Sequence, residues 1–165
     1  MPDSLAGHTH HYATTVTWTG NTGEGTATYR SYERAHDIAV DGKPVIAGSS
    51  DAAFRGDPAR WTPEDMLVAS LSTCHMLWYL HLASQANLVV TSYVDRAEGE
   101  MIEEVSGSGH FTKVTLRPEI VLAAGSTPEQ VERAREIHHD AHAMCFVAQS
   151  VNFPVETAGT ITIAA

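Results

Sequence analysis

Apolar and polar residues alternate over short stretches in the N-terminal part of the chain, and these stretches are rich in Thr, Val and aromatic residues. That composition and period are typical of β-strands. A Gly-Asn-Thr-Gly turn at 20–23 predicts that the first two strands form a hairpin. The strands we expect are Tyr12–Thr19, Gly25–Glu33, Arg34–Val40 and Val45–Ala47. A long polar loop follows, from Gly48 to Arg60.

The period changes at Thr62, where a helix is predicted to begin. Thr62 has the character of an N-cap, Pro63 suits the first helical position, and Glu64 and Asp65 suit the positive end of the helix dipole. Apolar residues then recur at three-and-four spacing as far as about Ala86. The face that we predict to point into the core carries Leu67, Leu71, Cys74, Leu77 or Trp78, and His81.

The C-terminal half predicts two long strands, a second helix and a last strand. The strands are Leu88–Met101 and Gly109–Leu122, which we expect to pair antiparallel. Thr127 and Gln130 form a capping box that opens a helix over Pro128–Ala143, so Cys145 lies at or just past its end. One more helical turn over 146–150 and a strand over Val155–Ile163, with Pro154 at its start, complete the chain.

This order of elements predicts an α+β fold, because the strands and the two helices do not alternate as they do in a doubly wound parallel sheet. The chain has 165 residues, 43% of them hydrophobic and 18% charged, which suits one domain over 1–165. Residues 1–9 are expected to form a loose polar leader.

Charge and composition narrow the possible functions. Ten Lys and Arg against twenty Asp and Glu give a formal charge of −10, which disfavours a nucleic-acid partner. The first residues lack a signal peptide, and polar residues interrupt the apolar stretch Met66–Ala83, which we interpret as a core helix and not a membrane span. Two cysteines are too few for a disulfide-rich secreted scaffold, so we expect a cytoplasmic protein with no membrane partner.

Cys74 and Cys145 are the residues most suited to chemistry, although free cysteines are also common as small buried hydrophobes. His75 adjoins Cys74, while His138 and His142 precede Cys145 with the one-turn spacing of a two-histidine metal site. The position directly after the first of these histidines, where a His-Glu-x-x-His site carries its acidic general base, is not acidic, and no third ligand is evident, so we predict neither a metal nor another cofactor. A role for the histidines at the negative end of the helix is favoured.

Two segments resemble the OsmC/Ohr family of thiol-dependent hydroperoxide reductases. One is Thr62–His75, with the sequence TPEDMLVASLSTCH, which is similar to the helix that carries the family's first cysteine. The other is HAMCFVAQS at 142–150, which looks like the second-cysteine segment. The first hairpin, around WTGNTGEGT at 18–26, extends the resemblance over nearly the whole chain.

The resemblance implies an intertwined homodimer in which antiparallel sheets wrap around two core helices. It also implies that Cys74 is the peroxidatic thiol, Cys145 the resolving thiol and Glu64 the carboxylate that orients a catalytic arginine. The partners implied are an organic hydroperoxide as substrate and an external dithiol as reductant, either lipoylated or thioredoxin-like.

The arginine is where this sequence departs from the family pattern, because Asn21, Thr22 and Gly23 occupy the positions where it is common. We predict Arg34 as the replacement and Arg30 as the second choice, with other arginines in the loop before the helix left open. A guanidinium is always charged and presents forked donors, which suits it to stabilise both a thiolate and a peroxide oxygen.

Three other functions stay open. The fold could serve as a non-catalytic binding or structural protein whose cysteines only pack, and the missing hairpin arginine favours this interpretation. A metal-binding module would use Cys74, His75, His138, His142 and Cys145. A hydrolase with Cys74 as nucleophile has no Cys-His-Asn order to support it.

Overall fold

A computed structural model describes residues 7–165 of the chain, which divide into two compact units, one up to Pro63 and one from Glu64 onward. Each unit is described by itself. Residues 1–6 of the predicted leader lie outside the described residues, and 7–9 belong to no helix or strand. That the whole chain is one domain stays a prediction.

The first unit contains one small antiparallel sheet. β1 (Thr15–Trp18) pairs with β2 (His36–Ala39), which pairs with β3 (Ile46–Gly48). A short 3-10 helix, η1 (Ala52–Phe54), interrupts the predicted loop. No hydrophobic side chain described in this unit is fully buried, so the unit has no closed core of its own.

The predicted strand Gly25–Glu33 is wrong, because that segment is a series of turns. Gly25 has a φ of 55°, and the Asn21 side chain accepts hydrogen bonds from the backbone N–H groups of Gly23 and Gly25. An Asn side chain that bonds local backbone groups in this way favours a turn over a ladder. The first hairpin is therefore closed by β2 instead, with Thr15 opposite Ala39 and Trp18 opposite His36.

The second unit is built on two helices, α1 (Pro63–Gln85) and α2 (Pro128–Met144), and both agree closely with the predicted ranges. The capping box is present, since Thr127 accepts from the Gln130 backbone and the Gln130 side chain accepts from the Thr127 backbone. Cys145 is the C-cap of α2, as predicted. Asn87 follows α1 with a φ of 57°, which ends the helix.

The two long strands are each divided in two. Their parts are β4 (Val90–Asp95), β5 (Glu98–Glu103), β6 (Gly109–Leu116) and β7 (Pro118–Leu122). β4 pairs with β7 and β5 with β6, both antiparallel as predicted. Each predicted strand thus begins in one three-stranded sheet and ends in the other. The change of sheet falls between β4 and β5 in the first and between β6 and β7 in the second.

The last strand is also divided, into β8 (Val155–Thr157) and β9 (Thr160–Ile163), after the 3-10 helix η2 (Ala148–Ser150). β8 pairs parallel with β6, and β9 pairs parallel with β7. The expected antiparallel sheets are therefore confirmed in part, because each sheet of this unit combines an antiparallel pair with a parallel pair, and the α+β class is confirmed.

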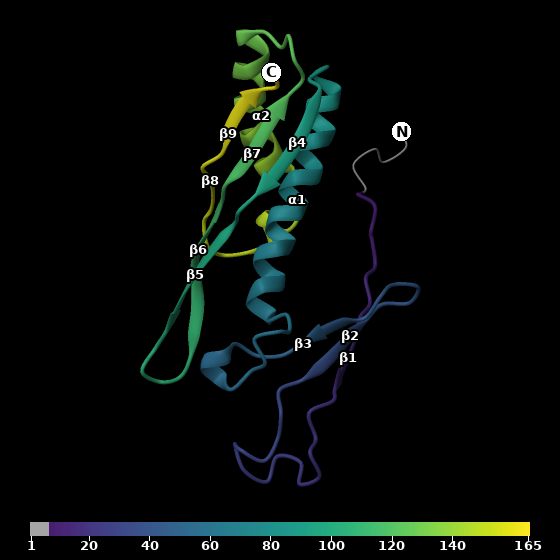
Figure 1. The fold of residues 1–165 in the computed structure, drawn as a ribbon, viewed down its shortest axis with the longest axis vertical. Helices are drawn as coiled ribbons and strands as arrows, with labels where there is room; N and C mark the ends of the chain where they lie inside the picture. Colours follow the sequence, from purple (N-terminus) through teal and green to yellow (C-terminus); the bar gives the residue numbers. More distant parts are fainter. Residues whose placement is uncertain (1–6) are drawn as a thin grey trace. The chain divides into compact units, whose positions relative to one another are not determined.

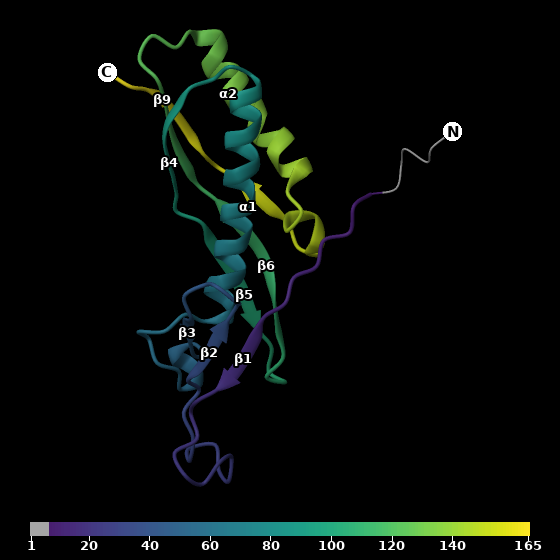
Figure 2. The same ribbon diagram turned by 90° about the vertical axis from the view of Figure 1, so that its right-hand side faces the viewer.

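Figure 2 shows α1 and α2 side by side on one face of the sheet β4-β7-β9. In Figure 1 this sheet is the green and yellow layer beside α1. The shared core holds Tyr79 and Ala83 of α1, Ile120 and Leu122 of β7, and Ala134, Ile137 and Ala141 of α2. A second cluster, around Leu71, Val114 and Leu116, joins the N-terminal half of α1 to β6.

The core-facing side of α1 agrees with the predicted face at Leu71 and differs from it from Cys74 onward. Its buried residues are Leu71, His75, Tyr79 and Ala83, whereas Cys74 is only partly buried and His81 is exposed. α1 is apolar on all sides, so that spacing alone does not select the face. By length and composition it is also the one helix within 7–165 that could cross a membrane; the absence of a membrane partner stays a prediction.

Candidate functional site

The two cysteines lie together in the second unit, although 71 residues separate them in sequence. Cys74 comes from the middle of α1 and is partly exposed, while Cys145 is buried at the C-terminal end of α2. The Cys145 thiol lies beside the Cys74 thiol, and both are free. This arrangement brings together two of the predicted site residues, one accessible and one buried.

The surroundings of Cys145 keep its sulfur protonated. Burial, and then the neighbouring Cys74 thiol, raise the pKa of Cys145 to about 11, although the backbone N–H of Ala148 donates to its Sγ at 3.4 Å. A thiol with so high a pKa is a poor nucleophile in isolation, because the thiolate is the reactive form. Cys145 can therefore react only with an activated partner held close to it.

A polar cluster lies in the core next to the thiols. The Nε2 of His75 and the Nδ1 of His138 are 3.1 Å apart, and the two rings are parallel within 9°. The ring of Tyr79 lies 4.5 Å from that of His138. On β4, Asp95 accepts hydrogen bonds from the Ser72 hydroxyl at 2.5 Å and from the Arg117 backbone at 2.6 Å.

Both imidazoles of this cluster are neutral at pH 7. Burial lowers the pKa of each to about 4, and the proximity of His138 contributes at His75. Their other ring nitrogens, Nδ1 of His75 and Nε2 of His138, are buried without a hydrogen-bond partner, as is the hydroxyl of Tyr93. The sequence grouped His75 with His138 only in the alternative of a metal-binding module and did not predict their direct contact; the one available signal was two histidines on helices that each carry a cysteine.

In the first unit, Arg34 is held by the turns that replace the predicted strand. Its guanidinium lies over the rings of Tyr29 and Tyr32, at 4.3 and 4.1 Å from their centres. Nη1 and Nη2 donate to the backbone carbonyl oxygens of Tyr32 and Tyr29. Stacking and donation together fix the orientation of this cation.

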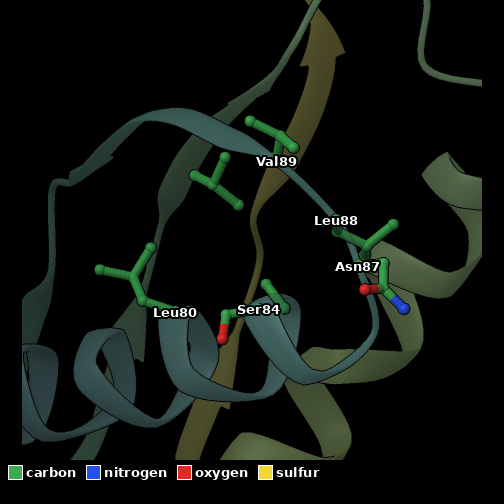
Figure 3. Close-up of a pocket in the computed structure, with 7 residues that line it drawn as sticks. Leu80, Ser84, Asn87, Leu88 and Val89 are labelled. Atoms are coloured by element: carbon green, nitrogen blue, oxygen red, sulfur yellow. The ribbon is translucent and has the colours of Figure 1, made fainter.

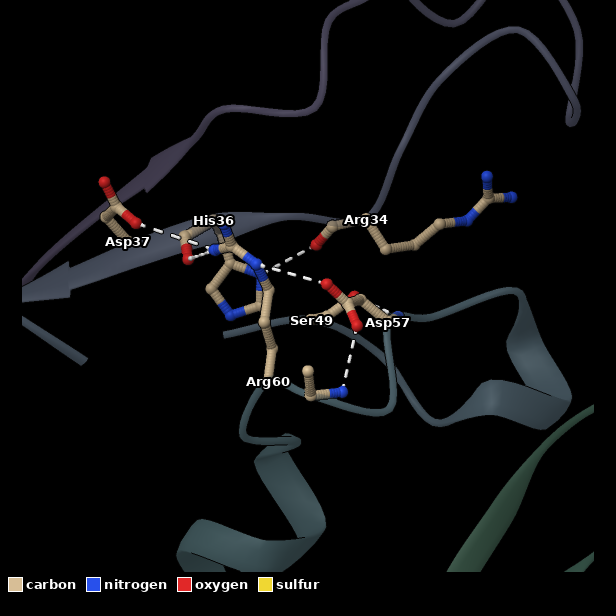
Figure 4. A network of polar contacts seen from close by, with 7 residues as sticks. Arg34, His36, Asp37, Ser49, Asp57 and Arg60 are labelled. Carbon is tan, nitrogen blue, oxygen red and sulfur yellow. Dashed lines mark hydrogen bonds and ion pairs between the residues drawn. The ribbon is translucent and has the colours of Figure 1, made fainter. Parts of the chain in front are cut away.

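A separate polar network surrounds Arg60 in the same unit. Arg60 approaches the carboxylates of Asp37 and Asp57 at 3.8 and 3.7 Å, and Nδ1 of the His36 ring lies 3.0 Å from the Arg34 carbonyl oxygen. Figure 4 shows the Arg34 side chain pointing away from this network. Arg60 thus pairs with carboxylates of its own unit. The Arg34 guanidinium does not take part in that network and lies against Tyr29 and Tyr32.

Among residues 7–165, Glu64 and Arg30 are described in separate units, and neither is placed against the thiols. Glu64 lies in the first turn of α1, partly buried, and Arg30 is exposed among the turns of the first unit. The pairing of Glu64 with Arg34 spans the two units and stays a prediction. Within residues 7–165 no group of three or more His, Cys, Asp or Glu side chains is arranged to hold a metal ion.

One pocket lies at the C-terminal end of α1, where the helix turns into β4 (Figure 3). Its volume is about 480 Å³, and Leu80, Ser84, Asn87 and Val89 are among the residues that line it. Ser84 lies ten residues beyond Cys74 on the same helix, so the pocket is roughly 15 Å along the axis from the thiols. None of the predicted catalytic residues is among those that line it.

Fold and site together define an α+β protein with a pair of thiols carried by its two helices. The model of the OsmC-like protein family matches residues 56–158, which is most of the chain, and the protein belongs to that family. The resemblance noted in the sequence is therefore confirmed.

One solved structure supports the same family assignment, and a more distant one shares the fold. An OsmC-like protein of unknown function from Vibrio cholerae is 35% identical, with a TM-score of 0.81 over 92% of this chain and 100% of that chain. The organic hydroperoxide resistance protein OhrB of Bacillus subtilis is 19% identical, with a TM-score of 0.59 over 91% and 98%. The uncharacterised protein YmaD of Bacillus subtilis is 20% identical over 149 residues, 89% of this chain and 90% of YmaD.

Proposed function

We propose that this protein is a thiol-dependent peroxidase that reduces organic hydroperoxides to alcohols. The observation that carries the proposal is the placement of a partly exposed Cys74 against a buried Cys145. The Cys74 thiolate attacks one oxygen of the peroxide, the O–O bond breaks, and the leaving alkoxide takes a proton to become the alcohol. Cys74 is left as the sulfenic acid.

Cys145 then attacks the sulfur of that sulfenic acid. The Cys74–Cys145 disulfide forms, and the sulfenic hydroxyl leaves as water with the proton of the Cys145 thiol. The high pKa of Cys145 suits this order, because the thiol stays protonated until an electrophilic sulfur appears beside it. An external dithiol, lipoylated or thioredoxin-like, then reduces the disulfide, and the cytoplasm is a compartment that keeps both thiols free.

Arg34 is the arginine that we assign to activation of the thiol, with Glu64 as the carboxylate that orients it. A guanidinium next to a thiol stabilises the thiolate and can donate to a peroxide oxygen. The stacked and hydrogen-bonded Arg34 is already ordered, which lowers the entropic cost of presenting it. Arg30 is the second choice.

Apolar side chains near the thiols favour an organic substrate. Trp78, one turn beyond Cys74 on α1, makes an edge-to-face contact with Phe146, whose side chain is 69% exposed. Burial of an alkyl group against these rings is favourable at about 25 cal/mol per Å². Among proteins of this fold, one from Elizabethkingia anophelis is also named an organic hydroperoxide resistance protein.

A homodimer is part of the proposal. The first unit buries no hydrophobic side chain fully within the part that the structure describes, and Val16, Trp18 and Trp61 are exposed there. A unit of this kind is stable only when another surface covers it. A second copy of the chain supplies such a surface in the arrangement that we propose.

Intact-mass analysis before and after one equivalent of cumene hydroperoxide tests the reaction directly. We expect the wild type to lose about 2 Da and both free thiols as the disulfide forms. Cys145→Ser should instead stop at a sulfenic acid on Cys74 that dimedone traps, and Cys74→Ser should not react. Unchanged thiols in the wild type would reject the peroxidase and favour the alternative, a non-catalytic binding or structural protein.

Substrate preference needs a separate measurement. Turnover with cumene hydroperoxide should exceed turnover with hydrogen peroxide at equal concentrations. Faster turnover with hydrogen peroxide would show that the apolar side chains do not select the substrate.

A further inference from the structure

The hydrogen bond between His75 and His138 connects the two helices that carry the thiols. His75 follows Cys74 directly on α1, and His138 lies about two turns before Cys145 on α2. Among the described residues, the other hydrogen bond between these helices runs from the Tyr79 hydroxyl to the Ala134 carbonyl oxygen, at 2.9 Å. That second bond lies one turn further from the cysteines on both helices.

A buried histidine paired with a half-buried one is a costly way to fill a core. Each leaves one ring nitrogen buried without a partner, and a pair of apolar side chains of similar volume would avoid that cost. The shared hydrogen bond is what the pair gains over an apolar contact, because it fixes both distance and orientation between two side chains. We therefore look for the role of the pair in the distance and orientation that this hydrogen bond fixes.

The pair is not suited to act as a base toward the Cys145 thiol. Burial lowers the pKa of each imidazole to about 4 and raises that of Cys145 to about 11, so a proton stays on this thiol and does not pass to an imidazole. The charged groups that face His75 do not change this balance, since Asp95 raises its pKa while His138 and His142 lower it. Position, and not proton transfer, is what the pair can supply.

We propose that His75 and His138 are positioning residues whose hydrogen bond holds Cys74 against Cys145 in the geometry required for a disulfide. The inference rests on the proposed function, in which this disulfide forms once in every catalytic cycle. Disulfide geometry is narrow, with Cα atoms usually about 4.4–6.8 Å apart, so a small displacement of α1 against α2 weakens the bond.

The stability of the Cys74–Cys145 disulfide can be measured without any peroxide. In glutathione redox buffers the two protein thiols and one glutathione disulfide give the protein disulfide and two glutathione thiols, which balances atoms and electrons. Intact mass after acid quenching gives the oxidised fraction and therefore the equilibrium constant. The intact chain is used throughout.

A matched pair of variants separates the hydrogen bond from the presence of a polar side chain. The amide of Asn has its polar atoms at the position of a histidine Nδ1, so His138→Asn keeps the bond to His75, whereas His138→Gln displaces the amide by one methylene. His75→Gln likewise keeps a polar atom at the Nε2 position, and His75→Leu removes it. Tyr79→Phe is the control, because it removes the second hydrogen bond between the same helices.

We expect the equilibrium constant for disulfide formation to fall about tenfold or more in His138→Gln and His75→Leu. His138→Asn and His75→Gln should stay within about threefold of the wild type, which a purely volume-filling role does not predict. Tyr79→Phe should lower thermal stability without changing the constant. Near-UV circular dichroism verifies folding, and the His138 pair decides the question if His75→Leu does not fold.

Two results would overturn the inference. One is an unchanged constant in His138→Gln and His75→Leu; the other is an equal loss in Tyr79→Phe, which would mean that any loosening of the helices suffices. Failure of the wild type to react with cumene hydroperoxide would reject the proposed function alone, because the glutathione equilibrium does not depend on it.

Discussion

The guanidinium carbon of Arg34 lies 4.1 Å from the centre of the Tyr32 ring, and its Nη1 donates to the carbonyl oxygen of the same residue. Tyr29 holds the other side of the guanidinium in the same way. This half-buried arginine loses much of its side-chain freedom in such a clamp, and the ring contacts and hydrogen bonds offset that entropic cost.

Replacement of this cation should therefore disable the peroxidase. Arg34→Gln is expected to lower cumene hydroperoxide turnover by about 100-fold, the usual loss when one preorganised donor is removed from a reaction centre. Arg30→Gln is the matched control, since Arg30 is exposed among the same turns, and it should retain activity. The reverse ranking of the two variants would transfer the role to Arg30.

The buried imidazoles make the stability of the fold depend on pH. The pKa of His75 and His138 is about 4 in the folded protein, against 6.5 for an unperturbed histidine. The unfolded chain therefore binds more protons between these values, and the free energy of unfolding should decrease as pH falls from 6.5 toward 4. The loss is at most about 3 kcal/mol per imidazole, and at His75 the opposing effect of the Asp95 carboxylate is already included in the lowered pKa.

Urea denaturation at pH 7.5, 6 and 5 measures this dependence. The double variant with His75→Gln and His138→Asn should show a shallower decrease, because its amides do not titrate. Identical slopes in both proteins would show that other groups control the acid sensitivity.

The capping box should make a measurable contribution to stability. Thr127→Ala removes the side-chain oxygen that accepts from the Gln130 backbone, and we expect a loss of about 1 kcal/mol in the free energy of unfolding. Thr127→Ser keeps the hydroxyl and should lose little. Equal losses in both variants would assign the effect to the methyl group.

Native mass spectrometry and light scattering test the homodimer. Each should give twice the mass of the 17.8 kDa chain. Trp61→Asp places a charge on an exposed apolar position of the first unit and is expected to weaken association. A monomer at micromolar concentration in the wild type would contradict the dimer.

Local signals in the sequence are enough to predict both helices and the end of α2. Pro63 and the Thr127 box act within one turn, so their effect does not depend on distant residues. The same locality explains why the position of Cys145 at the C-cap follows from the amino-acid sequence alone.

Long-range features do not follow from such local signals. The buried face of α1 is fixed by contacts with α2 and the sheets, which is why His75 and not Cys74 points into the core. The parallel pairing of β8 and β9 depends on strands far away in the chain. The contact of His75 with His138 likewise joins residues 63 positions apart.

Because β8 and β9 are the last strands of the chain, the two sheets of the second unit can be completed only at the end of synthesis. These final strands pair with β6 and β7 in different sheets, so both sheets of the second unit lack an edge until the last residues have left the ribosome. Chains emerge from the N-terminus at about 5–20 residues per second, so Cys74 spends seconds outside the ribosome before its sheets are complete. The nascent chain thus carries the Cys74 thiol beside a partly assembled core, and a message truncated before Val155 would yield a protein that lacks an edge strand in both sheets.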